Sequence, residues 1–283
     1  MTGEVRVVKG HGTENDFILV EDLDAALSLS PELVRALCDR HAGIGADGVL
    51  RVIRTKAATE PDVLDQADVA EYFMDYRNAD GSIAEMCGNG VRVFARYLSR
   101  AGLIDGPVSI ATRGGPKPVE FRGDQITVDM GRAALRSDRP RVTVAGFPGE
   151  FRGTALDLPN PHVVVQLPDE ASLQALDLTR PPVVEPPLPD GQNVEFVVRT
   201  GADRIAVRVH ERGVGETRSC GTGICAAVVA TAGEEGAHGQ WLVDVPGGRC
   251  EVSWTESGSV LLTGPAVLVA DLQIAESWLV EHR

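Results

Sequence analysis

The stretch Met86-Cys87-Gly88-Asn89-Gly90 and the stretch Ser219-Cys220-Gly221-Thr222-Gly223 decide the fold, because each places a Cys-Gly-x-Gly turn directly before an apolar segment. Residues 91–98 repeat apolar side chains at i, i+3, i+4 and i+7, which predicts an amphipathic helix. Residues 224–230 are apolar on every side, as is typical of a helix that is buried all round. The two turns therefore predict two halves of similar structure, each built around one helix.

The sequence before each cysteine repeats as well. A strand-like segment ends at Asn78, nine residues before Cys87, and another ends at Glu211, nine residues before Cys220. Earlier in each half an asparagine opens an apolar run, at Asn15 and at Asn160. The chain thus has the pattern of a duplication, and its two cysteine turns are expected to face each other across a cleft.

Short strand-like runs recur along the whole chain. We expect strands at residues 5–8, 17–20, 49–53, 125–129, 162–166, 194–198, 205–210 and 260–263. A further helix is predicted at residues 31–40, where Ser30 can cap the first turn and Pro31 occupies the favoured first position. Each half should therefore be mostly β-structure around one central helix.

The domain boundary is predicted in residues 131–139, a Gly-, Ser-, Asp- and Pro-containing run that follows a strand. The first domain should span residues 1–133 and the second residues 134–265. Residues 266–283 are expected to return to the first domain. The proline-rich stretch at residues 181–191 is expected to be a surface loop of the second domain.

The charge and composition of the chain indicate its partners. A formal net charge of −14 and a pI near 4.9 disfavour binding to nucleic acid or to an anionic membrane. No apolar run approaches the roughly 18 residues of a spanning helix, and residues 1–12 contain no apolar run of signal-peptide length. We therefore expect a cytoplasmic protein whose partners are small molecules or other proteins.

The cysteines do not have the spacing of a disulfide framework or of a zinc site. Their number is odd, and no C-x-x-C pair occurs. The six histidines add no metal-binding array, so no metal is expected. Cys38, Cys225 and Cys250 are expected to be buried apolar residues. Cys87 and Cys220 differ because each opens a helix.

A cysteine at the start of a helix has a specific chemical use. The positive end of the helix dipole lowers the pKa of the thiol from about 8.5, and free backbone N–H groups beside it can hold an anion. One thiol on each side of a ligand suits a proton exchange at an α-carbon, in which one thiolate removes a proton and the opposite thiol delivers another. The expected outcome is inversion of an amino-acid stereocentre without a cofactor.

Three further features each have a structural and a functional interpretation. Residues 43–48 match the dinucleotide pattern G-x-G-x-x-G, but they follow a predicted helix and precede a strand, so a tight turn against the active site is expected instead. Glu211 and Arg212 form either an exposed ion pair or a grip on a substrate ammonium and carboxylate. His162 is either an ordinary strand residue or a group that biases the protonation of a thiol.

The chain resembles the diaminopimelate epimerases, and their motifs follow in family order over nearly its whole length. The matching stretches are residues 9–17, 76–82, 86–90, 160–162, 193–196, 211–213 and 219–223. The resemblance implies an α+β fold of two pseudo-symmetric domains, each a barrel-like, mostly antiparallel sheet around a central helix, with the active site in the cleft between them. It also implies conversion of LL- to meso-2,6-diaminopimelate in lysine and peptidoglycan precursor synthesis, without pyridoxal phosphate or metal.

The resemblance assigns roles to individual residues. Cys87 and Cys220 would be the acid/base pair, with His162 and Glu211 modulating the thiols. The reacting carboxylate would be bound by Gly88, Asn89, Gly221 and Thr222. The distal amino-acid end of the substrate would be held by Asn15, Asn78, Asn160, Asn193, Glu211 and Arg212. Three departures from the family pattern occur: Gly48 replaces a common Gln, Thr13-Glu14 replaces Leu-Gly, and Pro159 replaces Gly.

Two alternatives remain at this level. A proline or hydroxyproline racemase would use the same chemistry, but its first motif usually has His where this chain has Asn89, and it lacks the distal polar contacts. A binding protein or redox sensor could use facing thiols without catalysis, although loss of one thiol would suit that role better. A homodimer is compatible with the sequence but is not indicated by any motif.

Overall fold

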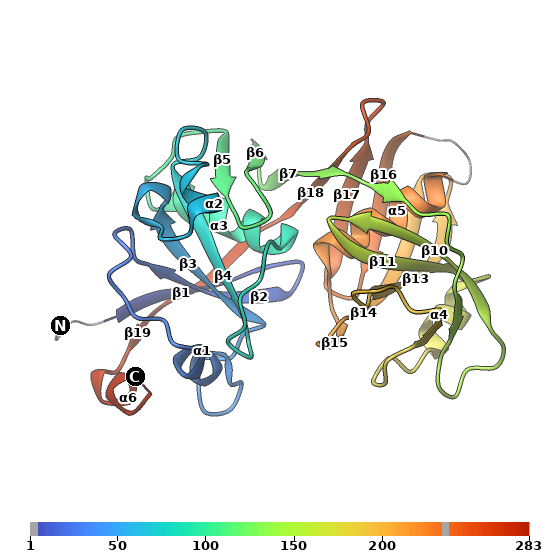
Figure 1. Ribbon diagram of the computed structural model, residues 1–283, viewed down its shortest axis with the longest axis horizontal. Coiled ribbons are helices and arrows are strands. Elements are labelled where there is room, and N and C mark those ends of the chain that lie inside the picture. The colour runs from blue at the N-terminus through green and yellow to red at the C-terminus, as the bar shows by residue number, and fades with distance from the viewer. Residues whose placement is uncertain (1–4, 234–237, 283) are drawn as a thin grey trace. The chain divides into compact units, whose positions relative to one another are not determined.

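The computed structural model describes residues 5–233 and 238–282. The chain divides into two compact units (Figure 1): unit 1 comprises Met1–Val128 and Pro265–Arg283, and unit 2 comprises Asp129–Gly264. All eight predicted strands are confirmed, because each predicted range lies within an observed strand. The fold is a mixed α+β fold, rich in β-structure and with few helices.

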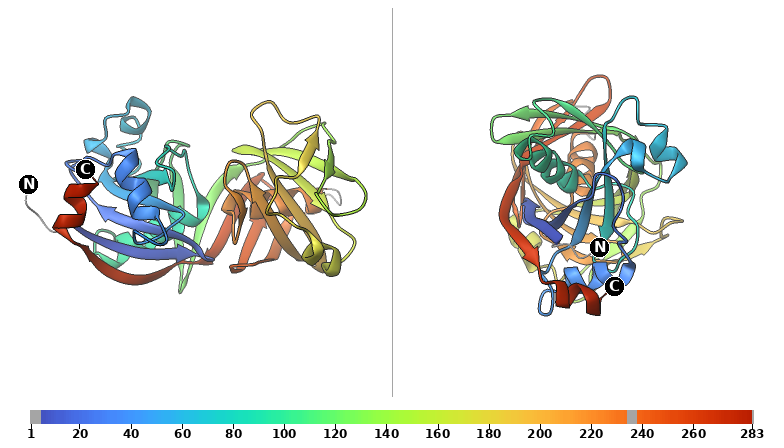
Figure 2. Two further views of the ribbon diagram at one scale, coloured as in Figure 1. Left: turned by 90° about the horizontal axis from the view of Figure 1, so that it is seen from below. Right: turned by 90° about the vertical axis from the view of Figure 1, so that its left-hand side faces the viewer.

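Unit 1 wraps its strands around one helix, α3 (Gly88–Arg100), which contacts six strands of the sheet and the returning strand β19. Its strands are β1 (Val5–Gly12), β2 (Asn15–Glu21), β3 (Gly48–Arg54), β4 (Tyr72–Asn78), β5 (Val108–Ala111), β6 (Lys117–Arg122), β7 (Gln125–Arg132) and β19 (Val267–Ile274). Its shorter helices are α1 (Pro31–Cys38), η1 (Thr55–Ala57), α2 (Pro61–Leu64) and α6 (Glu276–Glu281). Strand β19 pairs with β1 in antiparallel register, and the two lie side by side in Figure 2.

Unit 2 has the same plan around α5 (Gly221–Gly233), whose residues 221–232 are all buried. Its strands are β8 (Ala134–Leu135), β9 (Arg141–Thr143), β10 (Phe151–Leu158), β11 (Asn160–Gln166), β12 (Val183–Glu185), β13 (Asn193–Gly201), β14 (Arg204–Glu211), β15 (Gly215–Thr217), β16 (Gly239–Val245), β17 (Gly248–Trp254) and β18 (Ser259–Pro265). A short helix, α4 (Glu170–Ala175), lies between β11 and β12. The prediction of a loop at residues 181–191 was partly wrong, because β12 pairs there with β9.

The sheet topology confirms the duplication. In unit 1, β1 and β2 form a hairpin, β2 pairs with β3 in parallel, β3 pairs with β4 in antiparallel, and β4 pairs with β5 in parallel. Strands β10, β11, β13, β14 and β16 repeat this order with the same directions. The central helix follows β4 in unit 1, and in unit 2 it follows β14 and the short strand β15.

The strand register gives residue-by-residue equivalences between the units. Phe17 pairs with Gly48 across the parallel strands of unit 1, and His162 pairs with Asn193 across those of unit 2. Two residues further along β3 and β13, the equivalent positions are Leu50 and Glu195. The pairs Asn15 and Asn160, and Asn78 and Glu211, are likewise equivalent. The two units thus carry related frameworks with different side chains.

The start of α1 shows local sequence control. The Ser30 hydroxyl accepts a hydrogen bond from Leu33 N at 3.2 Å, and Pro31 occupies the first turn, as predicted. The helix ends at Cys38 rather than at Arg40, because Asp39 adopts an extended backbone conformation. Its Leu33, Val34 and Leu37 are buried against the sheet. An amphipathic helix of this kind gains most of its stability from that packing.

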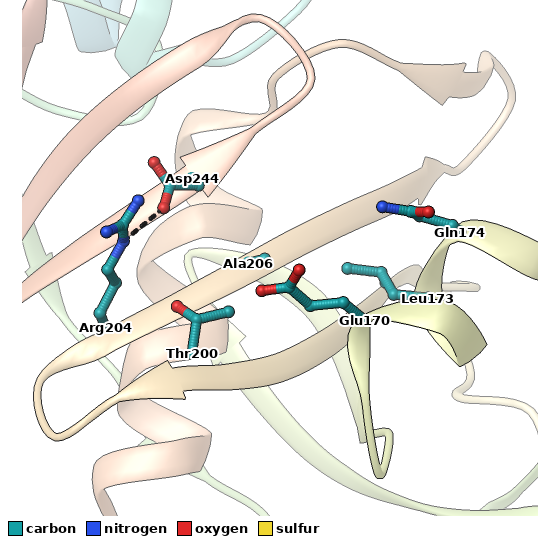
Figure 3. A pocket seen from close by; sticks show the side chains of 7 residues that line it. All are labelled: Glu170, Leu173, Gln174, Thr200, Arg204, Ala206 and Asp244. Atoms are coloured by element: carbon teal, nitrogen blue, oxygen red, sulfur yellow. Dashed lines mark hydrogen bonds and ion pairs between the residues drawn. The ribbon is translucent and has the colours of Figure 1, made fainter.

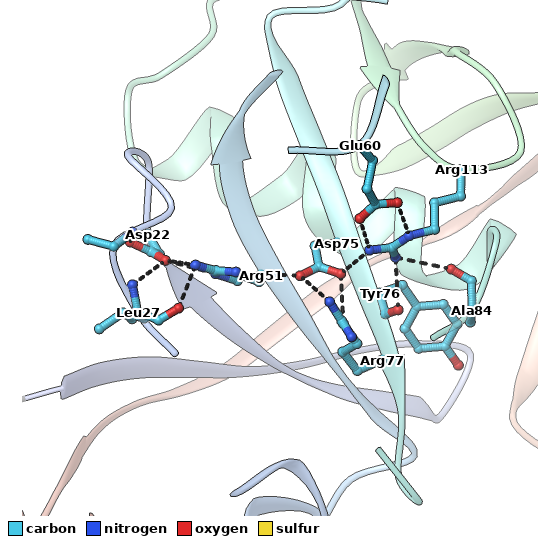
Figure 4. A network of polar contacts seen from close by, with 10 residues as sticks. Asp22, Leu27, Arg51, Glu60, Asp75, Tyr76, Arg77, Ala84 and Arg113 are labelled. Carbon is cyan, nitrogen blue, oxygen red and sulfur yellow. Dashed lines mark hydrogen bonds and ion pairs between the residues drawn. The ribbon is translucent and has the colours of Figure 1, made fainter. Parts of the chain in front are cut away.

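A buried polar network fixes the loop that leads from β4 to Cys87 (Figure 4). The Arg113 guanidinium donates to Asp75 at 2.6 Å and to both carboxylate oxygens of Glu60 at 2.6 and 2.7 Å. It also donates to the carbonyl oxygens of Tyr76 and Ala84 at 3.4 Å. Asp75 is only 2% exposed, and although burial opposes its ionisation, hydrogen bonds from Arg77 and Arg113 lower its pKa.

We predict that Arg113→Met destabilises the protein by about 3 kcal/mol, because it leaves a buried carboxylate short of a partner and frees the loop before Cys87. The matched control is Arg122→Met, since Arg122 is exposed and lies 3.8 Å from Glu120. That change should stay within about 0.5 kcal/mol of the parent. Urea unfolding measures both. Equal midpoints for the two variants would contradict a structural role for the network.

The second glycine of each Cys-Gly-x-Gly turn has different space around it in the two units. A Cβ at Gly90 would lie 3.4 Å from Leu50 Cδ2, an ordinary contact. A Cβ at the equivalent Gly223 would lie 2.7 Å from Glu195 Oε1 and 3.2 Å from Glu195 Cγ. Glu195 cannot swing away freely, because it is fully buried and its Oε1 lies 2.7 Å from His162 Nδ1.

We therefore predict opposite effects of two alanine substitutions. Gly90→Ala should leave stability unchanged or raise it by up to about 1 kcal/mol, since alanine favours the helix. Gly223→Ala should lower it by about 1–3 kcal/mol through overpacking against Glu195. Urea midpoints of the two variants and the parent would measure this. Equal stability of the Gly223→Ala and Gly90→Ala proteins would show that the Glu195 side chain can move away from residue 223.

Candidate active site

The first half-site is built on the first turn of α3. Cys87 is the N-cap residue, and its Sγ accepts a hydrogen bond from Gly90 N at 3.4 Å. The side chain of Cys87 is partly exposed, and its Sγ lies 3.5 Å from Asn15 Oδ1. The same oxygen accepts a hydrogen bond from Asn89 Nδ2 at 3.2 Å. The structure therefore brings together three of the predicted site residues of unit 1.

Asn15 is held from the other side by the residues 43–48 turn. Its Nδ2 donates to Asp47 Oδ2 at 2.7 Å, and Arg40 donates to Asp47 Oδ1 at 2.7 Å. Burial raises the pKa of Asp47, and the neighbouring Asp16 adds to that effect, whereas the bond from Asn15 opposes it. The turn lies between α1 and β3, as predicted, and it fixes an amide that faces Cys87.

A buried arginine completes this network. Arg92 has no exposed surface, and its guanidinium donates to Asn89 Oδ1 at 2.9 Å and to Thr13 Oγ1 at 3.3 Å. Thr13 and Glu14, which replace the family's Leu-Gly, form the β1–β2 turn in the left-handed conformation, with φ of 49° and 61°. This conformation is unfavourable for a β-branched residue, so the hydrogen bond from Arg92 helps to hold Thr13 there.

The second half-site is built on the first turn of α5. Cys220 immediately precedes this helix and is 7% exposed, and its Sγ lies 3.4 Å from Thr222 Oγ1. Its carbonyl accepts from Ile224 N at 2.9 Å, as the Cys87 carbonyl accepts from Val91 N at 2.8 Å. The two thiols thus occupy equivalent positions in the repeat.

The expected lowering of the thiol pKa is wrong for Cys220. Burial raises the pKa of this thiol well above its ordinary value, and the carboxylates of Glu211 and Glu195 raise it further. Hydrogen bonds from Thr222 and from Gly223 N act in the opposite direction but are weaker. Desolvation therefore outweighs the helix N-terminus, and burial together with the two carboxylates disfavours the Cys220 thiolate.

A buried chain of polar groups lies beside Cys220. His162 Nδ1 lies 2.7 Å from Glu195 Oε1, and His162 Nε2 lies 3.1 Å from Asn160 Oδ1. His162 and Glu195 are both completely buried, whereas Asn160 is partly exposed. His162 thus connects Asn160, a predicted substrate contact, to the buried carboxylate of Glu195.

The remaining predicted contacts lie at the ends of neighbouring strands. In unit 2, Asn193 Oδ1 accepts a hydrogen bond from Arg212 N at 2.9 Å, and Glu211 accepts one from the Thr217 hydroxyl. The Arg212 side chain is exposed and donates to the carbonyl of Asp190. In unit 1, Asn78 Nδ2 donates to Ser82 Oγ at 3.0 Å.

The register explains the departure at Gly48. Gly48 is equivalent to Asn193, so unit 1 has no side chain where unit 2 has a predicted substrate contact. A Cβ at this position would lie 2.5 Å from the carbonyl oxygen of Arg77 and 2.7 Å from Tyr76 Cε2. A larger residue would therefore require a shift of β4. The third departure, Pro159, lies in the turn between β10 and β11.

Sequence reasoning missed Glu195, Asp47 and Arg92, each of which contacts a predicted site residue. Glu195 and Arg92 had a readable signal, because each is a charged residue within an apolar run that the pattern places facing the core. Asp47 had none, since a turn aspartate usually bonds its own backbone. Cys38, Cys225 and Cys250 are buried, as predicted, and no disulfide joins any of the five cysteines.

Two surface pockets are lined by other residues. One pocket in unit 2, of about 370 Å³, has the Arg204–Asp244 ion pair at one side (Figure 3). Its other lining residues are Glu170, Leu173, Gln174, Thr200 and Ala206. A second pocket, of about 490 Å³, lies between β1, α3 and β19 of unit 1. Neither is lined by a predicted site residue.

Residues 5–233 and 238–282 lack two features. No cluster of three or more His, Cys, Asp or Glu side chains has an arrangement that could hold a metal ion. Within the same ranges, no helix combines the length and apolar character that crossing a membrane demands.

Known proteins resemble this chain in both sequence and structure. The diaminopimelate epimerase of Streptomyces coelicolor is 48% identical over 290 residues, covering 99% of this chain and 98% of that protein. The diaminopimelate epimerase of Mycolicibacterium smegmatis is 48% identical over 285 residues, covering 95% of this chain and 97% of that protein.

Among solved structures, a hydroxyproline epimerase from Agrobacterium vitis has a TM-score of 0.69 at 16% identity, covering 97% of this chain and 93% of that one. A phenazine biosynthesis protein of the PhzF family from Bacillus anthracis has a TM-score of 0.68 at 15% identity, covering 97% and 100%. These two structures share the fold. The diaminopimelate epimerase family model matches residues 7–136 and 154–269, so the chain belongs to the diaminopimelate epimerase family.

Proposed function

We propose that this enzyme converts LL-2,6-diaminopimelate to meso-diaminopimelate, in lysine and peptidoglycan precursor synthesis. The observation that carries the proposal is the pair of equivalent helix starts, each preceded by a cysteine, in a chain of this family. Family membership supports the substrate, and the two thiols support the chemistry. The proposed reaction needs no cofactor, because both proton transfers use protein side chains.

The reaction proceeds by two proton transfers at one carbon. One cysteine, as thiolate, removes the α-proton, and the electron pair of the C–H bond passes into the substrate carboxylate. The electron pair then returns to the α-carbon and takes a proton from the other cysteine, a thiol, on the opposite face, which inverts the stereocentre. Afterwards the first cysteine carries the proton and the second is a thiolate, so the reverse reaction starts from the exchanged protonation states.

The backbone at the two helix starts stabilises the charge that develops. N–H groups of the first turns, at Gly88, Asn89, Gly221 and Thr222, would donate to the reacting carboxylate. Such fixed dipoles need no reorganisation during the reaction, and removal of a single donor of this kind typically costs about 10²–10³-fold in rate. The reaction requires both half-sites to reach one substrate, which is the cleft arrangement expected from the sequence.

The distal end of diaminopimelate has its own ammonium and carboxylate. In the proposal, Asn15, Asn78, Asn160, Asn193, Glu211 and Arg212 hold this end. Arg212 would bind the carboxylate, since its guanidinium is exposed, and Glu211 would bind the ammonium. A proline racemase needs no such contacts, because its substrate ends at the ring. The same family assignment favours a catalyst over a thiol-based sensor.

We also propose a cytoplasmic location and a homodimeric assembly. A cytoplasmic enzyme fits a substrate that is a free amino acid and a pair of thiols that must stay reduced. A homodimer is a further proposal that sedimentation at several concentrations would test.

We predict that the reduced protein exchanges the α-proton of LL-diaminopimelate in deuterated water and inverts its α-carbon, but does neither with L-proline. Cys87→Ala and Cys220→Ala should each lower inversion by at least about 10²-fold, because each removes a proton carrier. Cys250→Ala is the matched control, since Cys250 is buried in β17 outside both half-sites, and it should keep its activity. NMR of the α-proton together with chiral chromatography measures exchange and inversion.

Two results would overturn parts of the proposal. Inversion of proline by the parent protein would refute the assigned substrate. Inversion that survives in both cysteine variants would refute the two-thiol mechanism.

A further inference from the structure

The repeat is broken at the positions that pack behind the two thiols. In unit 1 these positions hold Phe17 and Leu50, which are completely buried and lie 3.6 and 3.4 Å from a Cβ placed on Gly90. In unit 2 the register puts His162 and Glu195 at the same positions. An apolar pair therefore supports the Cys87 turn, and an acid–histidine pair supports the Cys220 turn.

Glu195 lies close to the thiol-bearing turn. A Cβ placed on Gly223 would be 2.7 Å from Glu195 Oε1 and 3.3 Å from Cys220 Cβ, so both residues line one small space. The other carboxylate oxygen, Oε2, is buried and has no hydrogen-bond partner. Leaving a carboxylate oxygen buried and unpaired is costly, and an apolar residue of similar size, as in unit 1, would avoid the cost. The position of Glu195 thus favours function over stability.

The electrostatic effect of this carboxylate on Cys220 has a definite sign. A negative charge beside a thiol disfavours the thiolate, and the Glu195 and Glu211 carboxylates both act in this direction. His162 holds Oε1 in place and also reaches Asn160. The other strands packed against α5 carry Asp157 on β10, Asp244 on β16 and Glu251 on β17. All three are partly exposed, and the two aspartates are paired with arginines.

We propose that Glu195 is a positioning residue that keeps the proton on Cys220 and, through His162, orients Asn160, so that Cys220 is the proton donor of the resting site. Unit 1 has no counterpart, since Leu50 carries no charge. The two thiols of a duplicated framework are in this way given different resting states. The inference rests on the proposed two-thiol reaction.

The first test measures Cys220 alone. In a Cys87→Ala background, the rate of iodoacetamide alkylation of Cys220 is followed against pH by peptide mass spectrometry and divided by its high-pH plateau. Glu195→Gln keeps the shape and removes the charge, so the midpoint should move to lower pH and the relative rate at neutral pH should rise about tenfold, the effect of one pKa unit. Glu195→Asp keeps the charge but places it farther from Cys220, because the side chain is one methylene shorter. The midpoint should therefore also move to lower pH, but by less.

The matched control is Glu185→Gln, which removes an exposed carboxylate from the same unit and should leave the Cys220 profile unchanged. An unshifted midpoint in both Glu195 variants would overturn the inference. If Glu195→Gln does not fold, the direction of the Glu195→Asp shift decides. Because alkylation needs no substrate, this test stands even if diaminopimelate is not the substrate.

The second test measures turnover in the presence of Cys87. Glu195→Gln should lower kcat by at least tenfold and shift the pH profile of kcat to lower pH. KM should stay within twofold of the parent value, because Glu195 reaches the predicted substrate contact Asn160 only through His162. Glu195→Asp should recover part of kcat. A proportional loss of kcat and of folded protein, without any shift of the pH profile, would indicate a structural role only and refute the inference.

Discussion

The constraint on which the structure depends is the burial of a helix start. A helix begins with unpaired N–H groups, and burying that end inside a sheet requires partners for them. In both units the cysteine before the helix accepts the first backbone hydrogen bond through its carbonyl. The Cys87 Sγ also accepts one from Gly90 N. In the proposed site, N–H groups of the same turn hold the substrate carboxylate, so the packing that makes the fold would also make the binding site.

Enclosure by the sheet then decides which side chains can surround each turn. Strands β2 and β3 in unit 1, and β11 and β13 in unit 2, run in parallel and start at the same edge, so their first residues converge near the helix start. Of the polar residues at those first positions, Asn15 contacts the Cys87 turn, whereas Asn160 contacts His162 and Asn193 accepts a hydrogen bond from Arg212 N. Residues two positions along lie behind the turn, because side chains alternate along a strand. Position along a strand therefore separates the predicted substrate contacts from the groups that support them.

The sequence predicted elements well where pattern and position agree. The central helices, the strands and the cysteine turns were readable because apolar periodicity and glycine spacing act locally. Short strands such as β8 and β12 were not, because two or three residues form a strand only when tertiary pairing supplies the partner. Residue roles such as those of Asn15 and His162 came from family motifs. The equivalence of Gly48 with Asn193 needed the register of the strands.

The protonation of Cys220 could not be read from the sequence for a physical reason. The helix-start position alone predicts a lowered pKa, and that effect is present in both units. Desolvation acts on the whole surroundings, and here it combines with two carboxylates that belong to different strands. The combined effect of these groups on the Cys220 pKa depends on how the side chains pack, not on their spacing in the sequence. Duplication supplies two equal thiols, but a reaction that starts with one thiolate and one thiol needs them to differ. A different residue at the position that packs behind the cysteine turn, Leu50 in unit 1 and Glu195 in unit 2, makes the two thiols differ without moving either cysteine.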